Sequence, residues 1–140
     1  MKDPDELIAG EIEYGKLIGM PSDELDRINR QPWVKTENVS EVRAYLIKAN
    51  ISKKYLDQFD AHIMGLVKNK NSSAWKDSMA EMFKDLNLPV EVGEKLKKIG
   101  PDTLPDDHAI RKKLLLDVGI DPEEVNKLHP FLDWLEDLHF

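Results

Sequence analysis

The sequence predicts an all-α protein, an irregular orthogonal bundle of seven to nine mostly short helices, on three observations. Residues that commonly start helices recur along the chain, and apolar residues follow them at steps of three and four. Glycine, asparagine or proline then closes most of these segments after about ten to sixteen residues. No stretch shows the sustained apolar–polar alternation that is typical of a half-buried strand. Short helices favour an orthogonal arrangement over a long four-helix bundle.

The first half of the chain predicts four helices. Asp3 is a favoured N-cap and Pro4 suits the first helical position. Asn38 and Glu41 match a capping box, in which each side chain reaches the other's backbone N–H. Asn50 tolerates the left-handed conformation with which many helices end. The predicted helices span residues 3–18, 22–31, 39–49 and 52–68.

The second half predicts helices in the same way, after a polar segment at residues 69–73. Asp121 and Pro122 repeat the start signal of the first helix. Pro130 removes a backbone donor, so we expect a break there between two short helices. The predicted helices span residues 74–86, 89–99, 106–118, 122–128 and 131–138.

The apolar stripes of these helices predict the core. The clearest stripe lies in residues 52–68, where Tyr55, Leu56, Phe59 and Ile63 follow at steps of one to four. The residues expected to be mostly buried are Leu46, Leu56, Phe59, Ile63, Phe83, Leu86, Leu96, Leu114 and Leu115.

Length and composition indicate one helical domain over residues 1–140, and residues 69–73 are the best candidate for a subdomain boundary. Hydrophobic residues make up 41% and charged residues 34%, as in globular chains. The chain has no cysteine, which excludes disulfides, thiolate catalysis and cysteine-based zinc sites and suits a cytoplasmic protein. Its apolar runs are too short for a membrane span.

The charge is acidic overall and uneven along the chain. The net charge is −7, and residues 101–140 contribute −6 of it from four basic and ten acidic side chains. Residues 34–71 carry +3, from seven basic and four acidic side chains. An acidic whole argues against a general binder of nucleic acid or of anionic membranes, and the basic segment is the exception.

The motifs that carry chemistry are absent or weak. The seven glycines are dispersed, so no phosphate loop is present. His129 and Asp133 are four residues apart and Glu136 and His139 three apart, which are spacings that can bring two metal ligands together. We interpret them as a solvated polar face, and we predict no catalytic residue, no metal site and no cofactor.

One segment has a local motif that indicates a specific function. Residues 49–56 (ANISKKYL) place Asn50 at a turn and Ser52 at the start of the next helix. This stretch resembles the turn and the start of the recognition helix in phage-repressor-type regulators. The resemblance implies that Ser52, Lys53 and Lys54 face DNA, with Arg43 as a backbone contact. An ordinary helix hairpin is the alternative interpretation.

The leading functional hypothesis is a non-enzymatic protein-binding module, such as an inhibitor, an immunity protein, an adaptor or a small regulatory protein. It would act through an acidic helical surface on a partner with a basic surface. We expect the contact residues Trp33, Phe131, Trp134 and Phe140, because one face of the last helix cannot easily bury all its large apolar groups. A helix-turn-helix DNA-binding regulator using residues 39–68 is the first alternative, and a small hydrolase or nuclease using His108, His129 or His139 with neighbouring acids is the second.

Overall fold

The computed structural model describes residues 1–86 and 90–140, and their regular structure is helical. Helices make up 69% of the structure, and the described residues form no strand, which confirms the predicted all-α class. One helix is interrupted by a π-helical turn, η1 (Asp60–Met64), which joins α4 to α5. The helices are α1 (Pro4–Leu17), α2 (Ser22–Arg30), α3 (Val39–Lys48), α4 (Lys53–Phe59), α5 (Gly65–Asn69), α6 (Trp75–Asp85), α7 (Val90–Ile99), α8 (His108–Asp117) and α9 (Pro122–Leu135).

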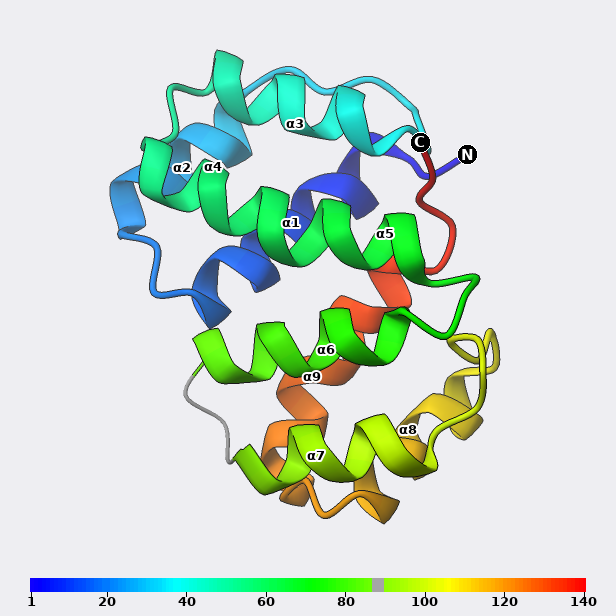
Figure 1. Ribbon diagram of the computed structural model, residues 1–140. Helices are drawn as coiled ribbons and strands as arrows, with labels where there is room; N and C mark the ends of the chain where they lie inside the picture. The colour runs from blue at the N-terminus through cyan, green and yellow to red at the C-terminus, as the bar shows by residue number, and fades with distance from the viewer. Residues whose placement is uncertain (87–89) are drawn as a thin grey trace.

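The helices form two groups that α9 connects. α1 to α5 fill the upper half of the view in Figure 1, and α6 to α8 fill the lower half. α9 runs behind them from the lower half to the upper, and it packs against both α1 and α8. The 69–73 segment joins α5 to α6, and these two helices also pack against each other. Within the described residues, no helix has the length and apolar content that crossing a membrane requires.

Local start and stop signals lie where the sequence predicts them. The side chain of Asn38 accepts a hydrogen bond from the backbone N–H of Glu41 at the start of α3. Asn50 has a φ of 59°, which places it in the left-handed region, and Gly19 and Gly119 adopt positive φ after α1 and α8. These positions tolerate a positive φ because glycine lacks a Cβ and because asparagine adopts the left-handed conformation more readily than most residues.

The expectation that Pro130 breaks the last helix is wrong. α9 continues through Pro130 to Leu135. A proline inside a helix costs about 3 kcal/mol, since it removes one backbone hydrogen bond and crowds the preceding turn. The helix offsets this cost by burying a broad apolar face, through Val125, Leu128, Phe131, Leu132, Trp134 and Leu135.

The predicted core is largely correct. Six of the nine expected residues are almost completely buried, and Leu56, Leu86 and Leu114 are half-buried and packed against that core. Gly10 lets α1 approach α9 closely, because a Cβ at this position would collide with the indole of Trp134. The close contact of these two helices therefore depends on a residue without a side chain.

Both ends of the chain pair with the segment that connects α2 to α3. Lys2 and Thr36 form one isolated β-bridge, and Asn38 and His139 form another. The His139 carbonyl accepts from the Val39 N–H at 2.8 Å, and the His139 N–H donates to the Glu37 carbonyl at 2.9 Å. We call this arrangement the terminal seam.

Lys70 secures the approach of the C-terminus to the seam. Its ammonium donates to the backbone carbonyl of Leu135, the last residue of α9, and to those of Glu136, at 2.6 Å, and Leu138 just after the helix. These carbonyls lie at a helix C-terminus, where they have no partner within the helix. Burial lowers the pKa of the Lys70 ammonium, although nearby acids oppose the effect.

Candidate functional site

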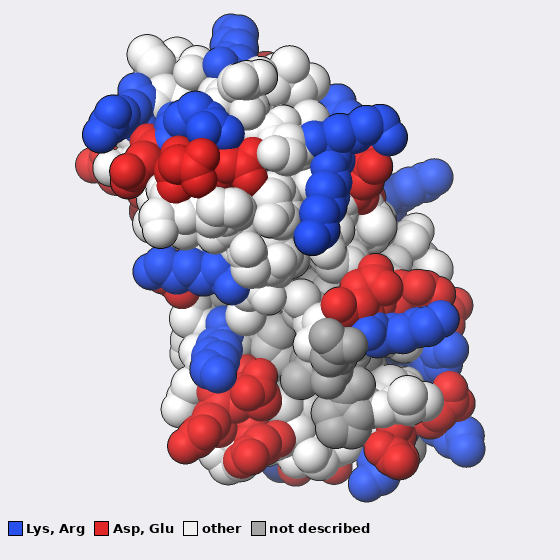
Figure 2. All heavy atoms as spheres, turned by 90° about the vertical axis from the view of Figure 1, so that its left-hand side faces the viewer, with Lys and Arg blue, Asp and Glu red and all other residues white. Residues whose placement is uncertain are grey.

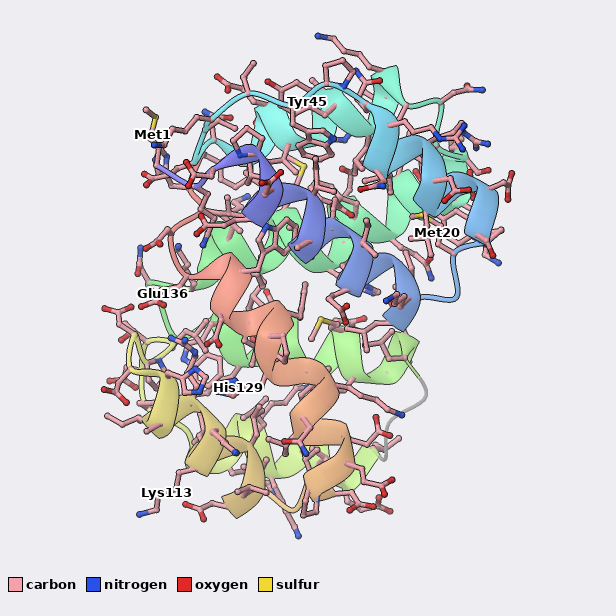
Figure 3. The ribbon with its side chains drawn as sticks, turned by 180° about the vertical axis from the view of Figure 1, so that it is seen from behind. Met1, Met20, Tyr45, Lys113, His129 and Glu136 are labelled. Atoms are coloured by element: carbon pink, nitrogen blue, oxygen red, sulfur yellow. The ribbon has the colours of Figure 1, made fainter. Side chains whose placement is uncertain are left out.

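The most elaborate polar cluster lies between α8 and α9. His108, at the start of α8, places its Nδ1 2.8 Å from Asp133 Oδ2. The His129 ring is nearly buried, with its Nδ1 3.4 Å from the same oxygen, and it meets the His108 ring edge-on at a centroid distance of 3.9 Å. Figure 3 shows His129 on the side of α9 toward α8. We call His108, His129 and Asp133 the histidine cluster.

Arg111 supports this cluster from the core side. Its guanidinium is 2% exposed and donates to Asp133 Oδ1 as well as to the carbonyls of Pro105 and Asp106, at 3.0 and 2.7 Å. Burial opposes ionisation of Asp133, but the hydrogen bond from Arg111 and the neighbouring histidines hold the pKa of this carboxyl below its ordinary value. Asp133 is therefore a carboxylate in a fixed orientation.

The sequence predicts only part of this cluster. The spacing of His129 and Asp133 predicts that they share a face of α9, and they do. His108 lies 21 residues before His129, in another helix, so no spacing rule predicts that the two rings meet. His139, by contrast, lies at the terminal seam, 3.6 Å from Glu37. Of the three histidines in the hydrolase hypothesis, the structure brings together two.

A second polar chain crosses the interior. The Tyr14 hydroxyl lies 3.1 Å from His62 Nδ1, and His62 Nε2 lies 2.9 Å from a carboxylate oxygen of Asp85. Tyr14 and His62 are buried, whereas Asp85 is 44% exposed in its side chain. Glu11, one turn before Tyr14, is fully buried and has no hydrogen-bond partner among the described residues. Burial raises the pKa of the Glu11 carboxyl well above its ordinary value.

α2 holds the turn between α3 and α4. Glu24 Oε1 accepts from both the backbone N–H and the hydroxyl of Ser52, at 2.7 and 2.6 Å. Arg27 donates to the carbonyls of Ala49 and Asn50 at the end of α3, and it also pairs with Glu24. One side chain thus caps the start of α4 and the other the end of α3.

The four residues in the nucleic-acid hypothesis lie around this turn, and most of them have partners within the chain. Arg43 binds Asp60 with two hydrogen bonds, of 2.6 and 3.1 Å, and the bonded carboxylate raises its pKa. Ser52 binds Glu24, as described above. Lys53 pairs with Asp57 at 3.2 Å, and the Lys54 ammonium lies 5.5 Å from the ring centre of Tyr55.

The residues of the partner-binding hypothesis are mostly in the core. Phe131 is 0% exposed and Trp134 is 4% exposed, because neighbouring helices cover α9 on more than one face. Trp33 is 7% exposed; its indole N–H donates to the Ile28 carbonyl and its ring packs on Tyr45. Phe140, at 55% exposure, is the one member of the four on the surface.

A groove between α6 and α7 is the surface feature that the sequence does not reveal. Its volume is about 470 Å³, and Phe83, Ala80 and Gly93 line its apolar part. Val90, at the start of α7, is 69% exposed at its edge. The charged lining residues are Asp77, Glu81, Lys84, Glu94 and Lys97. Figure 2 shows acidic and basic side chains gathered on one face of the lower half of the molecule, where α6 and α7 lie.

In the part of the chain that the structure describes, these features define an all-α protein with several polar clusters and with a charged groove between α6 and α7. Comparison with protein-family models, with curated proteins and with solved structures gave no match for this chain.

Proposed function

We propose that this protein is a non-enzymatic protein-binding module and that the α6–α7 groove is its contact surface. The observation that carries the proposal concerns the ion pairing of the five charged residues that line the groove. None of them forms an ion pair within the described part of the chain, although both signs are present. Their side chains are exposed and surround an apolar centre. An apolar centre inside a charged rim is the usual anatomy of a protein interface.

The charges also favour a partner of one kind. Acids outnumber lysines by three to two around the groove, and the chain as a whole carries −7. A segment with an apolar side chain beside basic residues would fill the centre and pair with the rim. The partner is therefore a protein with a basic surface, and the module acts as an inhibitor, immunity protein, adaptor or small regulatory protein. A cytoplasmic location is part of the proposal, supported by the lack of cysteine.

Site-specific crosslinking tests the location of the surface. A photo-crosslinking amino acid at Val90, at the edge of the groove, should capture the partner in cells. The same amino acid at Ile110 on α8, which is 55% exposed, is the matched control and should not. Equal capture at both positions would contradict the proposal.

Charge reversal then tests the chemistry of the captured partner. Glu81→Lys with Glu94→Lys should weaken its affinity about tenfold or more, since each rim charge would repel a basic surface. Asp102→Lys with Asp117→Lys makes the same change in net charge at exposed positions outside the groove, and should have little effect. Calorimetry measures both affinities, and equal values for the two variants would refute the role of the groove.

A helix-turn-helix DNA-binding regulator is the second candidate, because one specific observation favours it. The left-handed Asn50 and the hydrogen bonds between Glu24 of α2 and Ser52 give the α3–α4 pair the tight turn that such motifs need. Lys53 and Lys54 are exposed at the start of α4. The competing ion pairs of Arg43 and Lys53 weigh against it.

Fluorescence anisotropy with mixed-sequence duplex DNA distinguishes the two candidates. A DNA reader would bind with an affinity that falls steeply with salt, and Lys53→Glu with Lys54→Glu would abolish binding. Lys112→Glu with Lys113→Glu, an exposed pair on α8, is the control. Binding that both double variants reduce equally would indicate non-specific attraction and not recognition by α4.

A further inference from the structure

The histidine cluster holds its three donor atoms at the spacing of a metal site. The Asp133 Oδ2 oxygen lies 2.8 Å from His108 Nδ1 and 3.4 Å from His129 Nδ1, and one ligand atom from each residue lies within 4.8 Å of the others. Tetrahedral zinc, with bonds of about 2.0–2.1 Å, sets neighbouring ligand atoms about 3.3 Å apart. In the structure His108 Nδ1 donates its hydrogen to the Asp133 carboxylate, so a bound metal ion would replace this hydrogen bond. Binding would need the other tautomer of His108 and a small rotation of its exposed ring.

The hydrogen bonds of His129 fix which of its nitrogens can bind a cation. Its Nε2 lies 3.0 Å from the backbone carbonyl of His108. A carbonyl oxygen can only accept, so Nε2 carries the hydrogen and a neutral ring has its lone pair on Nδ1. That lone pair faces the Asp133 carboxylate at 3.4 Å, so a cation placed between the two atoms would be favourable to both. A histidine that donates its second nitrogen to a carbonyl is the usual arrangement of a metal ligand.

The residues around Asp133 orient its Oδ2 oxygen and determine the net charge of the site. Arg111 occupies Oδ1 and is itself fixed by two carbonyls, so Oδ2 is directed at the two imidazoles. Arg111 also lies 3.5 Å from Glu136. With neutral histidines, one guanidinium and two carboxylates give the group a net charge of −1, which attracts a cation despite the arginine.

We propose that His108, His129 and Asp133 bind a divalent transition-metal ion of the zinc class. Two imidazoles and one carboxylate suit such ions, and three protein ligands leave a fourth position for water or another ligand. The open position lies toward solvent beside His108, whose side chain is 65% exposed. Arg111 acts as the outer support that holds the carboxylate in place.

Titration with Zn²⁺ alone tests the proposal on the full chain. Calorimetry should show one saturable site, with a rise in melting temperature that a chelator reverses. Replacing the metal by Co²⁺ should give the visible absorption bands of a tetrahedral nitrogen–oxygen site. Affinity should fall as the pH is lowered, because protons compete with the metal ion for the same nitrogens.

Two histidine variants provide the matched comparison. His108→Ala should weaken Zn²⁺ binding about 100-fold or more, since loss of an outer support alone commonly costs 10- to 100-fold. His139→Ala removes an exposed histidine at the terminal seam and should leave binding intact. His108→Gln repeats the test with a larger side chain, should the alanine variant fold poorly.

Several results would overturn the proposal. A chain that shows no saturable Zn²⁺ binding has no such site. Equal binding by the original chain and by His108→Ala or His108→Gln would place the ion elsewhere. Loss of binding in His139→Ala would assign the ion to the seam histidine.

Discussion

Replacement of Glu11 by glutamine should change how the stability of the protein depends on pH. Glu11 is fully buried and has no hydrogen-bond partner in the described part of the chain, and burial raises the pKa of its carboxyl above the ordinary value of 4.5. Below that ordinary value both the folded and the unfolded chain hold the proton, so the carboxyl causes no pH dependence. Above 4.5 the unfolded chain releases the proton, whereas the folded protein still binds it. The stability that this proton contributes is therefore lost as the pH rises toward the pKa of Glu11 in the folded protein.

The magnitude follows from linkage between proton binding and folding. One proton bound only by the folded state makes the free energy of unfolding fall by about 1.4 kcal/mol per pH unit. Glu11→Gln removes the titrating group and keeps the shape. The variant should therefore resemble the original chain near pH 4 and become more stable than it by about 1.4 kcal/mol for each further pH unit within the window.

Urea denaturation at several pH values measures this difference. Trp33, Trp75 and Trp134 are all buried, so tryptophan fluorescence reports unfolding. Glu13→Gln, which replaces an exposed carboxyl on the same helix, is the control and should change stability by less than about 0.5 kcal/mol. Parallel stability curves for Glu11→Gln and the original chain would contradict this prediction, since they would mean that burial does not raise the pKa of the Glu11 carboxyl.

Three further predictions concern packing and capping, and urea denaturation tests each of them. Gly10→Ala should destabilise the protein by about 1–3 kcal/mol, because the new Cβ would meet the Trp134 indole. In the control, Gly65→Ala, the nearest atom to the new Cβ is 3.9 Å away, and the protein should become more stable by about 0.5–1 kcal/mol. Stability changes of the same sign in both variants would contradict the described packing. Glu24→Ala should cost about 2–3 kcal/mol of stability, because it loses the hydrogen bonds to Ser52. Asp23→Ala, at an exposed position on the same helix, should cost less than about 0.5 kcal/mol. Similar costs for the two variants would mean that Glu24 does not stabilise the turn between α3 and α4. Phe59→Ala should cost about 3–5 kcal/mol, and a loss below about 1 kcal/mol would mean that the side chain is not in the core.

The sequence predicted the features that depend on neighbours along the chain. Asn38 caps α3 through the backbone of Glu41, three residues away, and Asn50 turns the chain by its own conformational preference. Both effects act within one helical turn, so local residue types determine them. The stripe that contains Phe59 and Ile63 was equally readable, because a helix that buries one face must repeat its apolar residues.

The features that sequence analysis missed depend on contacts between distant segments. Pro130 stays within α9 because the burial of that helix outweighs a local penalty, which no local rule can weigh. Glu24 finds Ser52 across 28 residues, and His108 finds His129 across 21. The interpretation of the α9 polar residues as a solvated face failed to anticipate this contact, since α8 had to be placed before the cluster existed.

The terminal seam has a consequence for how the chain frays. Chain ends usually open independently and at little cost in free energy. Here Lys2 and His139 both pair with residues 36–38, so the two ends share one docking segment. Opening either end exposes part of that segment and weakens the hold on the other. Fraying therefore becomes a cooperative event, and the amide hydrogens of Thr36, Val39 and His139, which donate the seam's hydrogen bonds, should exchange with solvent at matching rates.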